Sequence, residues 1–140
     1  MPGLFGVAEL GHSAKQEREE MHALFANMAT TLRHHDEDRL EQAGTSGSNL
    51  LVGRIGLPYQ NPVPWPSDAG GDGPRLRTFV SGPLIERGPN GENGKLPDSA
   101  ALCRWRGFFS AVLTNPHRGV TLIVADRRAS IPIFYVQAGN

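Results

Sequence analysis

Histidines and carboxylates follow one another directly from His34 to Asp38, where the sequence reads His-His-Asp-Glu-Asp. Imidazole nitrogens and carboxylate oxygens are common ligands of divalent cations, so a metal site is one interpretation of this cluster. Adjacent residues point in different directions, however, and no second pair of ligands follows at a defined spacing. We therefore favour the alternative, a solvated loop, and predict no metal site on this chain.

Two other reactive side chains stand apart from this cluster. Asp126 precedes Arg127 and Arg128 and could be an acidic site residue, but a carboxylate in a turn between strands more often caps backbone N–H groups or pairs with an arginine. Cys103 is the single cysteine, so no disulfide can form within the chain. We predict a structural role for Asp126 and a packed or half-buried thiol at Cys103.

The N-terminal Met1-Pro2 pair offers a third kind of chemistry. After removal of Met1, the secondary amine of Pro2 could act as a general base near neutral pH, as it does in tautomerases that use an N-terminal proline. The alternative is that Pro2 fills the start of a strand, where it lacks only an edge donor. We favour the second interpretation, because no arginine-lined acid-binding site accompanies the proline.

The elements that would position these residues alternate between β and α patterns. The apolar run at residues 3–10 predicts a strand, and the Ser13-x-x-Gln16 spacing predicts a capping box that starts a helix. The apolar residues of this helix recur at steps of three and four, which predicts one buried stripe. The stripe consists of Met21, Leu24, Phe25, Met28 and Leu32.

Further strands and long loops alternate through the rest of the chain. Short apolar runs bounded by turn residues predict strands at residues 49–57, 76–82, 107–114, 120–125 and 131–136. Polar, glycine-rich or proline-rich segments predict loops at residues 34–47, 58–74 and 83–99. Trp65 and Trp105 are expected to act as core or loop anchors. The pattern indicates an α+β fold.

Composition excludes several classes of partner. The 140 residues are sufficient for one domain, and 14 Lys and Arg balance 14 Asp and Glu. A chain without a basic excess is not expected to bind nucleic acid. No run of apolar residues is long enough to cross a bilayer, and no cationic start precedes an apolar leader. We therefore predict a cytoplasmic protein without a membrane partner.

Four stretches, in order, are similar to one known family. The opening Met-Pro-Gly-Leu-Phe-Gly resembles Met-Cys-Gly-Ile-Phe-Gly, and residues 28–38 resemble Met-x3-Leu-x-His-Arg-Gly-Pro-Asp. Residues 107–113 resemble Gly-x-Phe-Ala-x-Ala-Leu, and residues 124–135 resemble Ala-Arg-Asp-x-x-Gly-x-x-Pro-Leu-Tyr-Tyr. The series resembles the N-terminal glutaminase domain of asparagine synthetase, a class II glutamine amidotransferase with the N-terminal nucleophile hydrolase fold.

This resemblance implies a fold and a domain organisation. Such a domain is an αββα sandwich of two stacked, mainly antiparallel sheets with a helix on an outer face. Residues 1–140 would be one glutamine amidotransferase type 2-like domain that is incomplete at its C-terminal end.

The resemblance also implies which residues occupy the site. In the family, an N-terminal Cys attacks the glutamine amide, but here Pro2 stands at that position and has no nucleophilic side-chain atom. The family's oxyanion-hole Asn-Gly corresponds to Ser81-Gly82, and its glutamine-binding Arg corresponds to Arg54, although strict counting would place Ile55 there. The family's Gly-Ser-Asp has no counterpart. The assignment of Arg54, Ser81 and Gly82 is therefore that of a vestigial substrate site.

We expect a degenerate amidotransferase-like domain without glutaminase activity. As in the related β-lactam synthetases and lasso-peptide cyclases, it would act as scaffold or partner for an ATP-dependent, amide-forming synthetase domain or subunit, or it would self-associate. This chain would hold no cofactor, because ATP and Mg²⁺ would bind only the separate synthetase domain. The alternatives are a fragment of a functional glutamine- or ammonia-dependent asparagine synthetase, and a small non-enzymatic interaction module.

Overall fold

The computed structural model describes residues 3–8, 15–44, 50–62, 65, 67–68, 77–86, 97–115, 118–131 and 133. Most of the predicted elements are present, with boundaries that shift by a few residues. In chain order they are β1 (Gly3–Ala8), α1 (Lys15–Leu32), β2 (Arg39–Gly44), β3 (Leu50–Gly56), the 3-10 turn η1 (Pro58–Gln60), β4 (Ser67–Asp68), β5 (Arg77–Ser81), β6 (Leu84–Glu86), α2 (Ser99–Leu102), β7 (Arg106–Gly107), β8 (Ser110–Asn115) and β9 (Val120–Ala125).

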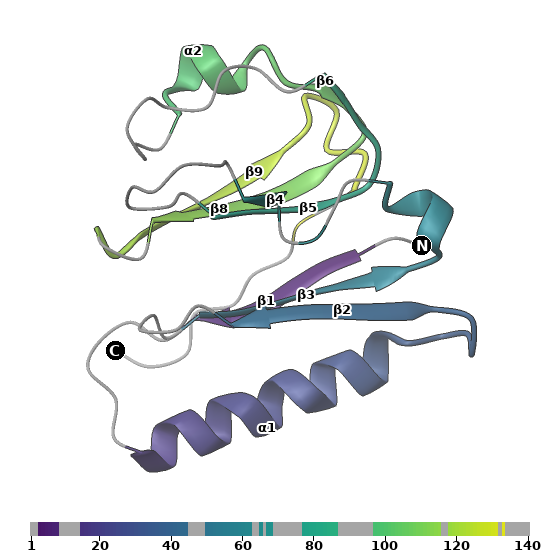
Figure 1. Ribbon diagram of the computed structural model, residues 1–140, viewed down its shortest axis with the longest axis vertical. Helices are drawn as coiled ribbons and strands as arrows, with labels where there is room; N and C mark the ends of the chain where they lie inside the picture. Colours follow the sequence, from purple (N-terminus) through teal and green to yellow (C-terminus); the bar gives the residue numbers. More distant parts are fainter. Residues whose placement is uncertain are drawn as a thin grey trace.

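The strands pair into antiparallel sheets that are stacked in layers (Figure 1). The first sheet has the order β1-β3-β2 and the second sheet has the order β4-β5-β8-β9, while β6 and β7 form a small separate pair. Helix α1 covers the outer face of the first sheet, and α2 lies on the far side of the second (Figure 1). The predicted α+β class and the mainly antiparallel sheets are confirmed.

The alternation of side chains along β3 explains why this strand is apolar on both faces. Leu51 and Ile55 face α1 and pack in a cluster with Phe5 and Phe25, whose ring centroids are 4.9 Å apart. Leu50 and Val52 point the other way and pack against Phe79 in the core between the two sheets. A strand whose two faces are both covered does not alternate between apolar and polar residues, as a half-exposed strand does.

The two tryptophans are anchors, as predicted. The Trp65 ring packs against Phe79 with a centroid distance of 5.0 Å, at the edge of the core between the sheets. Trp105 is 4% exposed and packs 5.7 Å from Phe109 in a third cluster, on the outer face of the second sheet. Each ring therefore ties a loop to a sheet.

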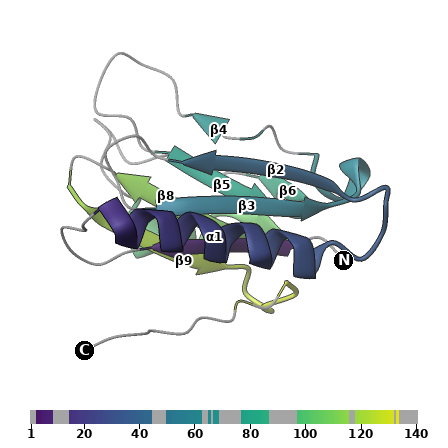
Figure 2. The ribbon, with the colours of Figure 1, turned by 90° about the horizontal axis from the view of Figure 1, so that it is seen from below.

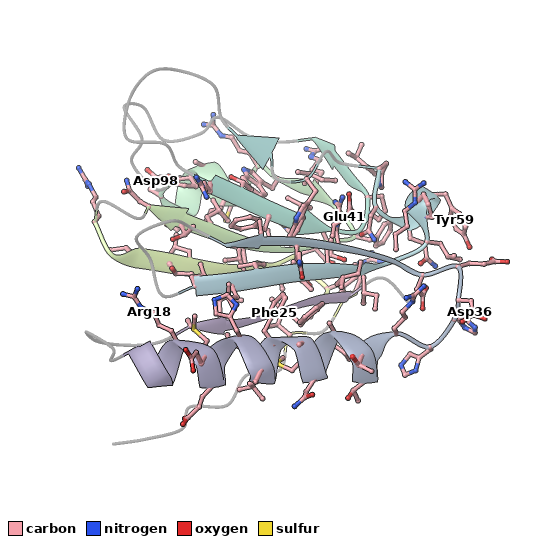
Figure 3. All side chains as sticks on the ribbon, turned by 60° about the horizontal axis from the view of Figure 1, so that its bottom comes forward. Arg18, Phe25, Asp36, Glu41, Tyr59 and Asp98 are labelled. Atoms are coloured by element: carbon pink, nitrogen blue, oxygen red, sulfur yellow. The ribbon has the colours of Figure 1, made fainter. Side chains whose placement is uncertain are left out.

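Helix α1 confirms the prediction of a helix but corrects its stripe. Met21, Phe25 and Ala29 are buried at steps of four, and Phe25 points from the helix toward the first sheet (Figure 3). Leu24 is 51% exposed and Leu32 is 38% exposed, so both lie outside the buried stripe. Neighbouring helical residues are about 100° apart around the axis, which turns Leu24 away from the sheet when Phe25 faces it. The predicted capping box begins outside the described residues.

The prediction of a loop over residues 34–47 is wrong, because β2 lies within it. Strand β2 is an edge of the first sheet, beside β3 (Figure 2). An edge strand with one covered face tolerates many polar residues, and only Ala43 of this strand packs in the core between the sheets. The segment at residues 83–99 likewise contains β6 and the start of α2.

The predicted strand at residues 131–136 lies largely outside the described residues. Its two described residues, Ile131 and Ile133, are not in a strand. Strand β9 is therefore the last strand of the second sheet within the described part of the chain.

Candidate functional site

Arg54 lies at the centre of β3 and points into the space between the two sheets. Its Cα is paired with that of Glu41 on β2, and the Arg54 Nε donates to Glu41 Oε2 over 2.8 Å. The Arg54 Nη2 donates to the same carboxylate oxygen, and Nη1 reaches across the sandwich to the carbonyl oxygen of Val80, 2.8 Å away. The guanidinium carbon lies 4.9 Å from the ring centroid of Trp65.

These contacts close Arg54 off from solvent. Its side chain is 2% exposed, whereas the side chain of Glu41 is 40% exposed. A buried guanidinium needs a charge partner and hydrogen-bond acceptors, and Glu41 and Val80 supply them. The arginine that would bind a substrate carboxylate is therefore already engaged with a carboxylate of its own chain.

Asn61 links the end of β3 to the end of β5. Its Oδ1 accepts hydrogen bonds from the Ser81 hydroxyl at 3.1 Å and from the Gly82 backbone N–H at 3.0 Å. Its Nδ2 donates to the carbonyl oxygen of Ile55 over 3.5 Å. Ser81 is fully buried, so this one carboxamide connects the first sheet to the turn after β5.

The backbone at Gly82 requires glycine. Its φ is +93°, and a Cβ built on it would lie 2.2 Å from the carbonyl oxygen of Phe108 and 2.5 Å from Ile131 Cδ1. No other residue type fits so close to a neighbouring backbone without displacing it. Gly82 is thus fixed by the packing of the turn that carries Ser81.

The start of β1 lies at the same end of the sandwich. Gly3 is paired with Ile55, whose carbonyl oxygen accepts the hydrogen bond from Asn61. The first described residue is therefore next to the strand end that Asn61 joins to Ser81-Gly82. Pro2 itself lies outside the described residues.

The structure brings together three of the predicted site residues. Arg54 bonds to Val80, the residue before Ser81 and Gly82, and all three are buried. Of the two candidates for the family's arginine position, the Arg54 side chain faces the second sheet and the Ile55 side chain faces α1. In chemical terms the Ser81 hydroxyl and the Gly82 N–H both donate to Asn61, so neither is directed at a developing oxyanion.

Sequence reasoning missed Glu41 and Asn61. Glu41 was assigned to a loop, and only the pairing of β2 with β3 places it opposite Arg54. Asn61 stands in the proline-rich segment, directly before Pro62. An asparagine in such a segment often bonds to backbone groups with its side chain, which is the one signal that could have identified it.

Asp126 has the structural role that its sequence context predicts. Its Oδ2 accepts from the backbone N–H groups of Phe109 and Ser130, each at 3.1 Å. Its Oδ1 accepts from the N–H of Arg128 at 2.8 Å. The turn that follows holds Ala129 at φ +49°, a left-handed conformation that is rare for a residue with a Cβ.

Ala129→Gly is expected to raise the free energy of unfolding by about 0.5–1 kcal/mol. The left-handed backbone costs a residue with a Cβ about 1–2 kcal/mol, and the greater freedom of glycine in the unfolded chain offsets part of the gain. Urea denaturation measures the change. Ala125→Gly, in the exposed face of β9, is the control and should lower stability by a similar amount. A loss of stability in Ala129→Gly would contradict the strain at this turn.

The cluster at residues 34–38 lies in the turn between α1 and β2. The Asp38 carboxylate is buried, and its Oδ2 accepts from the N–H groups of His35 at 3.0 Å and His34 at 3.2 Å. Burial raises the pKa of Asp38, but the hydrogen bonds from His35 and His34 and the charge of His35 together lower it below its ordinary value of 3.8. Within the described residues, no three His, Cys, Asp or Glu side chains are grouped to hold a metal ion.

The lowered pKa of Asp38 predicts a stability contribution with a defined pH window. This contribution is complete above pH 3.8, the ordinary pKa, and is lost as the pH falls through the lowered folded-state pKa. The difference in unfolding free energy between the parent and Asp38→Asn should therefore be constant near neutral pH and shrink in acid. Asp36→Asn, at an exposed position of the same turn, is the control, because the N–H groups of His34 and His35 donate to Asp38 and not to Asp36. A parent-minus-variant difference that grows in acid would contradict the assignment.

The prediction for Cys103 is wrong. The residue follows α2, and its side chain is exposed rather than packed. Its carbonyl oxygen accepts a hydrogen bond from Arg127 Nη2 at 2.9 Å, so its structural contact is made by the backbone. Leu102, the residue before it, packs against the apolar cluster of the second sheet, and successive residues of a helical turn face different directions.

None of the described helices is long and apolar enough to span a membrane. Comparisons of the chain with protein-family models, curated proteins and solved structures gave no match.

Proposed function

We propose that this chain is a degenerate class II glutamine amidotransferase-like domain, of the N-terminal nucleophile hydrolase type, that does not hydrolyse glutamine. In such a domain an N-terminal thiolate attacks the glutamine amide, and hydrogen-bond donors stabilise the tetrahedral oxyanion. Pro2 supplies no thiolate. The domain would act as a scaffold for an ATP-dependent, amide-forming synthetase, on a second polypeptide or in a longer gene product, that binds ATP and Mg²⁺ itself.

Several structural features support this assignment of the family. Two stacked antiparallel sheets with a helix on the outer face fit the expected sandwich. Left-handed backbone occurs at Gly82 and at Ala129, and these are two positions where the family sequence has glycine. The start of β1 lies beside Ile55 at the end of the sandwich that also holds Ser81 and Gly82.

The main support for a loss of glutaminase activity is the position of the Asn61 carboxamide. Its Oδ1 takes the Gly82 N–H, the donor that an oxyanion would need, and it takes the Ser81 hydroxyl as well. Loss of one oxyanion-hole donor typically costs about 10²–10³-fold in rate. The charge of Arg54 is also neutralised by Glu41. The arginine and the two donors at Ser81 and Gly82 therefore all bond to groups of their own chain.

Ammonia release and glutamine binding by the unaltered chain test this proposal. The purified chain, with its mature N-terminus verified by mass, should release no ammonia from glutamine above the buffer rate. Calorimetry should detect no glutamine binding up to about 1 mM, a concentration at the upper end of ordinary KM values. Ammonia release would instead support a functional asparagine synthetase fragment.

The scaffold role has its own test, which separates it from a simple interaction module. A Ser-Gly-Gly-x-Asp-Ser pyrophosphatase motif, encoded in the same gene or in a polypeptide that co-purifies with the chain, would support an amide-forming system. A stable assembly with a polypeptide that lacks such a motif would favour the interaction module.

A further inference from the structure

A pocket of about 430 Å³ is lined in part by Trp105, which packs in the cluster on the outer face of the second sheet. Its lining comes from two segments that are distant in sequence, residues 105–108 and residues 126–128. The backbone N–H of Asp126 donates to the carbonyl oxygen of Phe109 over 3.0 Å, and Asp126 Oδ2 accepts from the Phe109 N–H. The two walls are therefore held together by one main-chain hydrogen bond and by one hydrogen bond to the Asp126 carboxylate.

The rim of this pocket is positively charged. Arg106, Arg127 and Arg128 line it and are exposed, and the one acidic residue in the lining is Asp126. The Asp126 carboxylate already accepts hydrogen bonds from the turn that follows it. Arg127 is held over the pocket by its bond to the Cys103 carbonyl, which reduces the ordering cost when it binds an anion.

The apolar part of the pocket is formed by the side chains of Trp105 and Phe108. Trp105 is 4% exposed beneath it, whereas the ring of Phe108 is 51% exposed. The Phe108 N–H donates to the carbonyl oxygen of Pro83, which places the pocket next to β6, where Ile85 is 76% exposed. Exposed apolar residues beside a charged rim are typical of protein interaction sites.

The backbone of the turn distinguishes between classes of anion. A phosphate-binding loop presents free N–H groups to its ligand. Here the N–H groups of Arg128 and Ser130 donate to the Asp126 carboxylate, and that of Ala129 donates to the Asp126 carbonyl oxygen. Recognition is left to guanidinium groups and aromatic surface, a combination that suits carboxylates flanking an apolar side chain.

We propose that this pocket docks an acidic segment of a partner polypeptide, with one apolar side chain seated against Phe108 and Trp105. Carboxylates on either side of that anchor would pair with Arg127 and Arg128. This inference goes beyond the proposed function and does not depend on the glutamine site. Its failure would leave the glutaminase result unchanged.

Fluorescence anisotropy with a labelled peptide, Asp-Glu-Asp-Leu-Phe-Glu-Asp, tests the proposal on the full chain. The acidic peptide should bind, and a matched peptide with Asn and Gln in place of the acids should not. Arg127→Gln with Arg128→Gln should weaken binding about tenfold, because each rim pair contributes up to about a fivefold effect. Arg104→Gln is the control, since Arg104 is exposed nearby but does not line the pocket.

Nuclear magnetic resonance locates the contact, and small anions test the alternative ligand. The indole N–H resonance of Trp105 should shift on titration with the acidic peptide, and inorganic phosphate at matched ionic strength should not displace that peptide. Four results would each overturn the proposal: no binding of the acidic peptide, equal binding of the neutral peptide, equal weakening by Arg104→Gln, or displacement by phosphate.

Discussion

Glu41→Gln is expected to lower the free energy of unfolding by about 3 kcal/mol, a large effect for a residue on an edge strand. The substitution leaves Arg54 buried at 2% exposure without the carboxylate that receives its Nε and Nη2 hydrogen bonds. The stacking of Trp65 on the guanidinium replaces only part of that interaction. Chemical denaturation followed by tryptophan fluorescence measures the loss.

Substitution of the other partner, Arg54→Met, should lower the free energy of unfolding by less than Glu41→Gln does. In Arg54→Met the carboxylate of Glu41, which is 40% exposed, regains water, and the methionine fills space beside Trp65. The double variant should then resemble Arg54→Met alone, with a coupling energy of about 3 kcal/mol, equal to the loss expected for Glu41→Gln by itself. Loss of the partly exposed Glu41 carboxylate should thus destabilise the fold more than loss of the buried Arg54 guanidinium.

Glu37→Gln is the matched control, because Glu37 is an exposed acid in the turn before β2. It should change the free energy of unfolding by less than about 0.5 kcal/mol. If Glu41→Gln also costs less than about 1 kcal/mol, water must reach Arg54, and the account of a closed arginine fails.

Gly82→Ala is expected to destabilise the fold by about 3 kcal/mol or more. The new Cβ would meet the carbonyl oxygen of Phe108 at 2.2 Å and Ile131 Cδ1 at 2.5 Å, and the backbone carbonyl cannot turn away cheaply. Overpacking typically costs about 1–3 kcal/mol, and the left-handed φ of +93° adds about 1–2 kcal/mol for a residue with a Cβ. Thermal and chemical denaturation should both report the loss.

Gly119→Ala separates these two contributions. Gly119 also has a left-handed φ, +61°, but a Cβ there would meet nothing within 4 Å. This variant should therefore show only the conformational cost of about 1–2 kcal/mol. Equal losses in Gly82→Ala and Gly119→Ala would show that the turn after β5 is not tightly packed against Phe108.

The sequence was most informative where a strand is a short apolar run between turn residues. The apolar runs that became β3, β5, β8 and β9 are bounded by Gly, Pro and Asn, and each predicted strand matches an observed one within a few residues. The helix was equally clear, because its apolar residues recur with a helical period. Its stripe was placed too broadly, since period alone does not decide whether Leu24 or Phe25 faces the sheet.

The features that sequence patterns missed are those created by tertiary pairing. Strand β2 is polar, and only its position at the edge of the first sheet makes Glu41 the partner of Arg54. Asn61 bonds to Ser81 and Gly82, which are about twenty residues further along the chain. No local pattern reports a contact of that kind, so the closure of the candidate site became visible only in three dimensions.

Ammonia release from glutamine by a Pro2→Cys variant tests the central claim most directly. The variant is made in a Cys103→Ser background, so that the only thiol is the one at the N-terminus, and a companion variant adds Asn61→Ala. We expect background rates for the parent and for Pro2→Cys, with any hydrolysis confined to the variant in which Asn61 no longer accepts from the Gly82 N–H. Hydrolysis by the parent, or by Pro2→Cys with Asn61 in place, would contradict a closed, degenerate site.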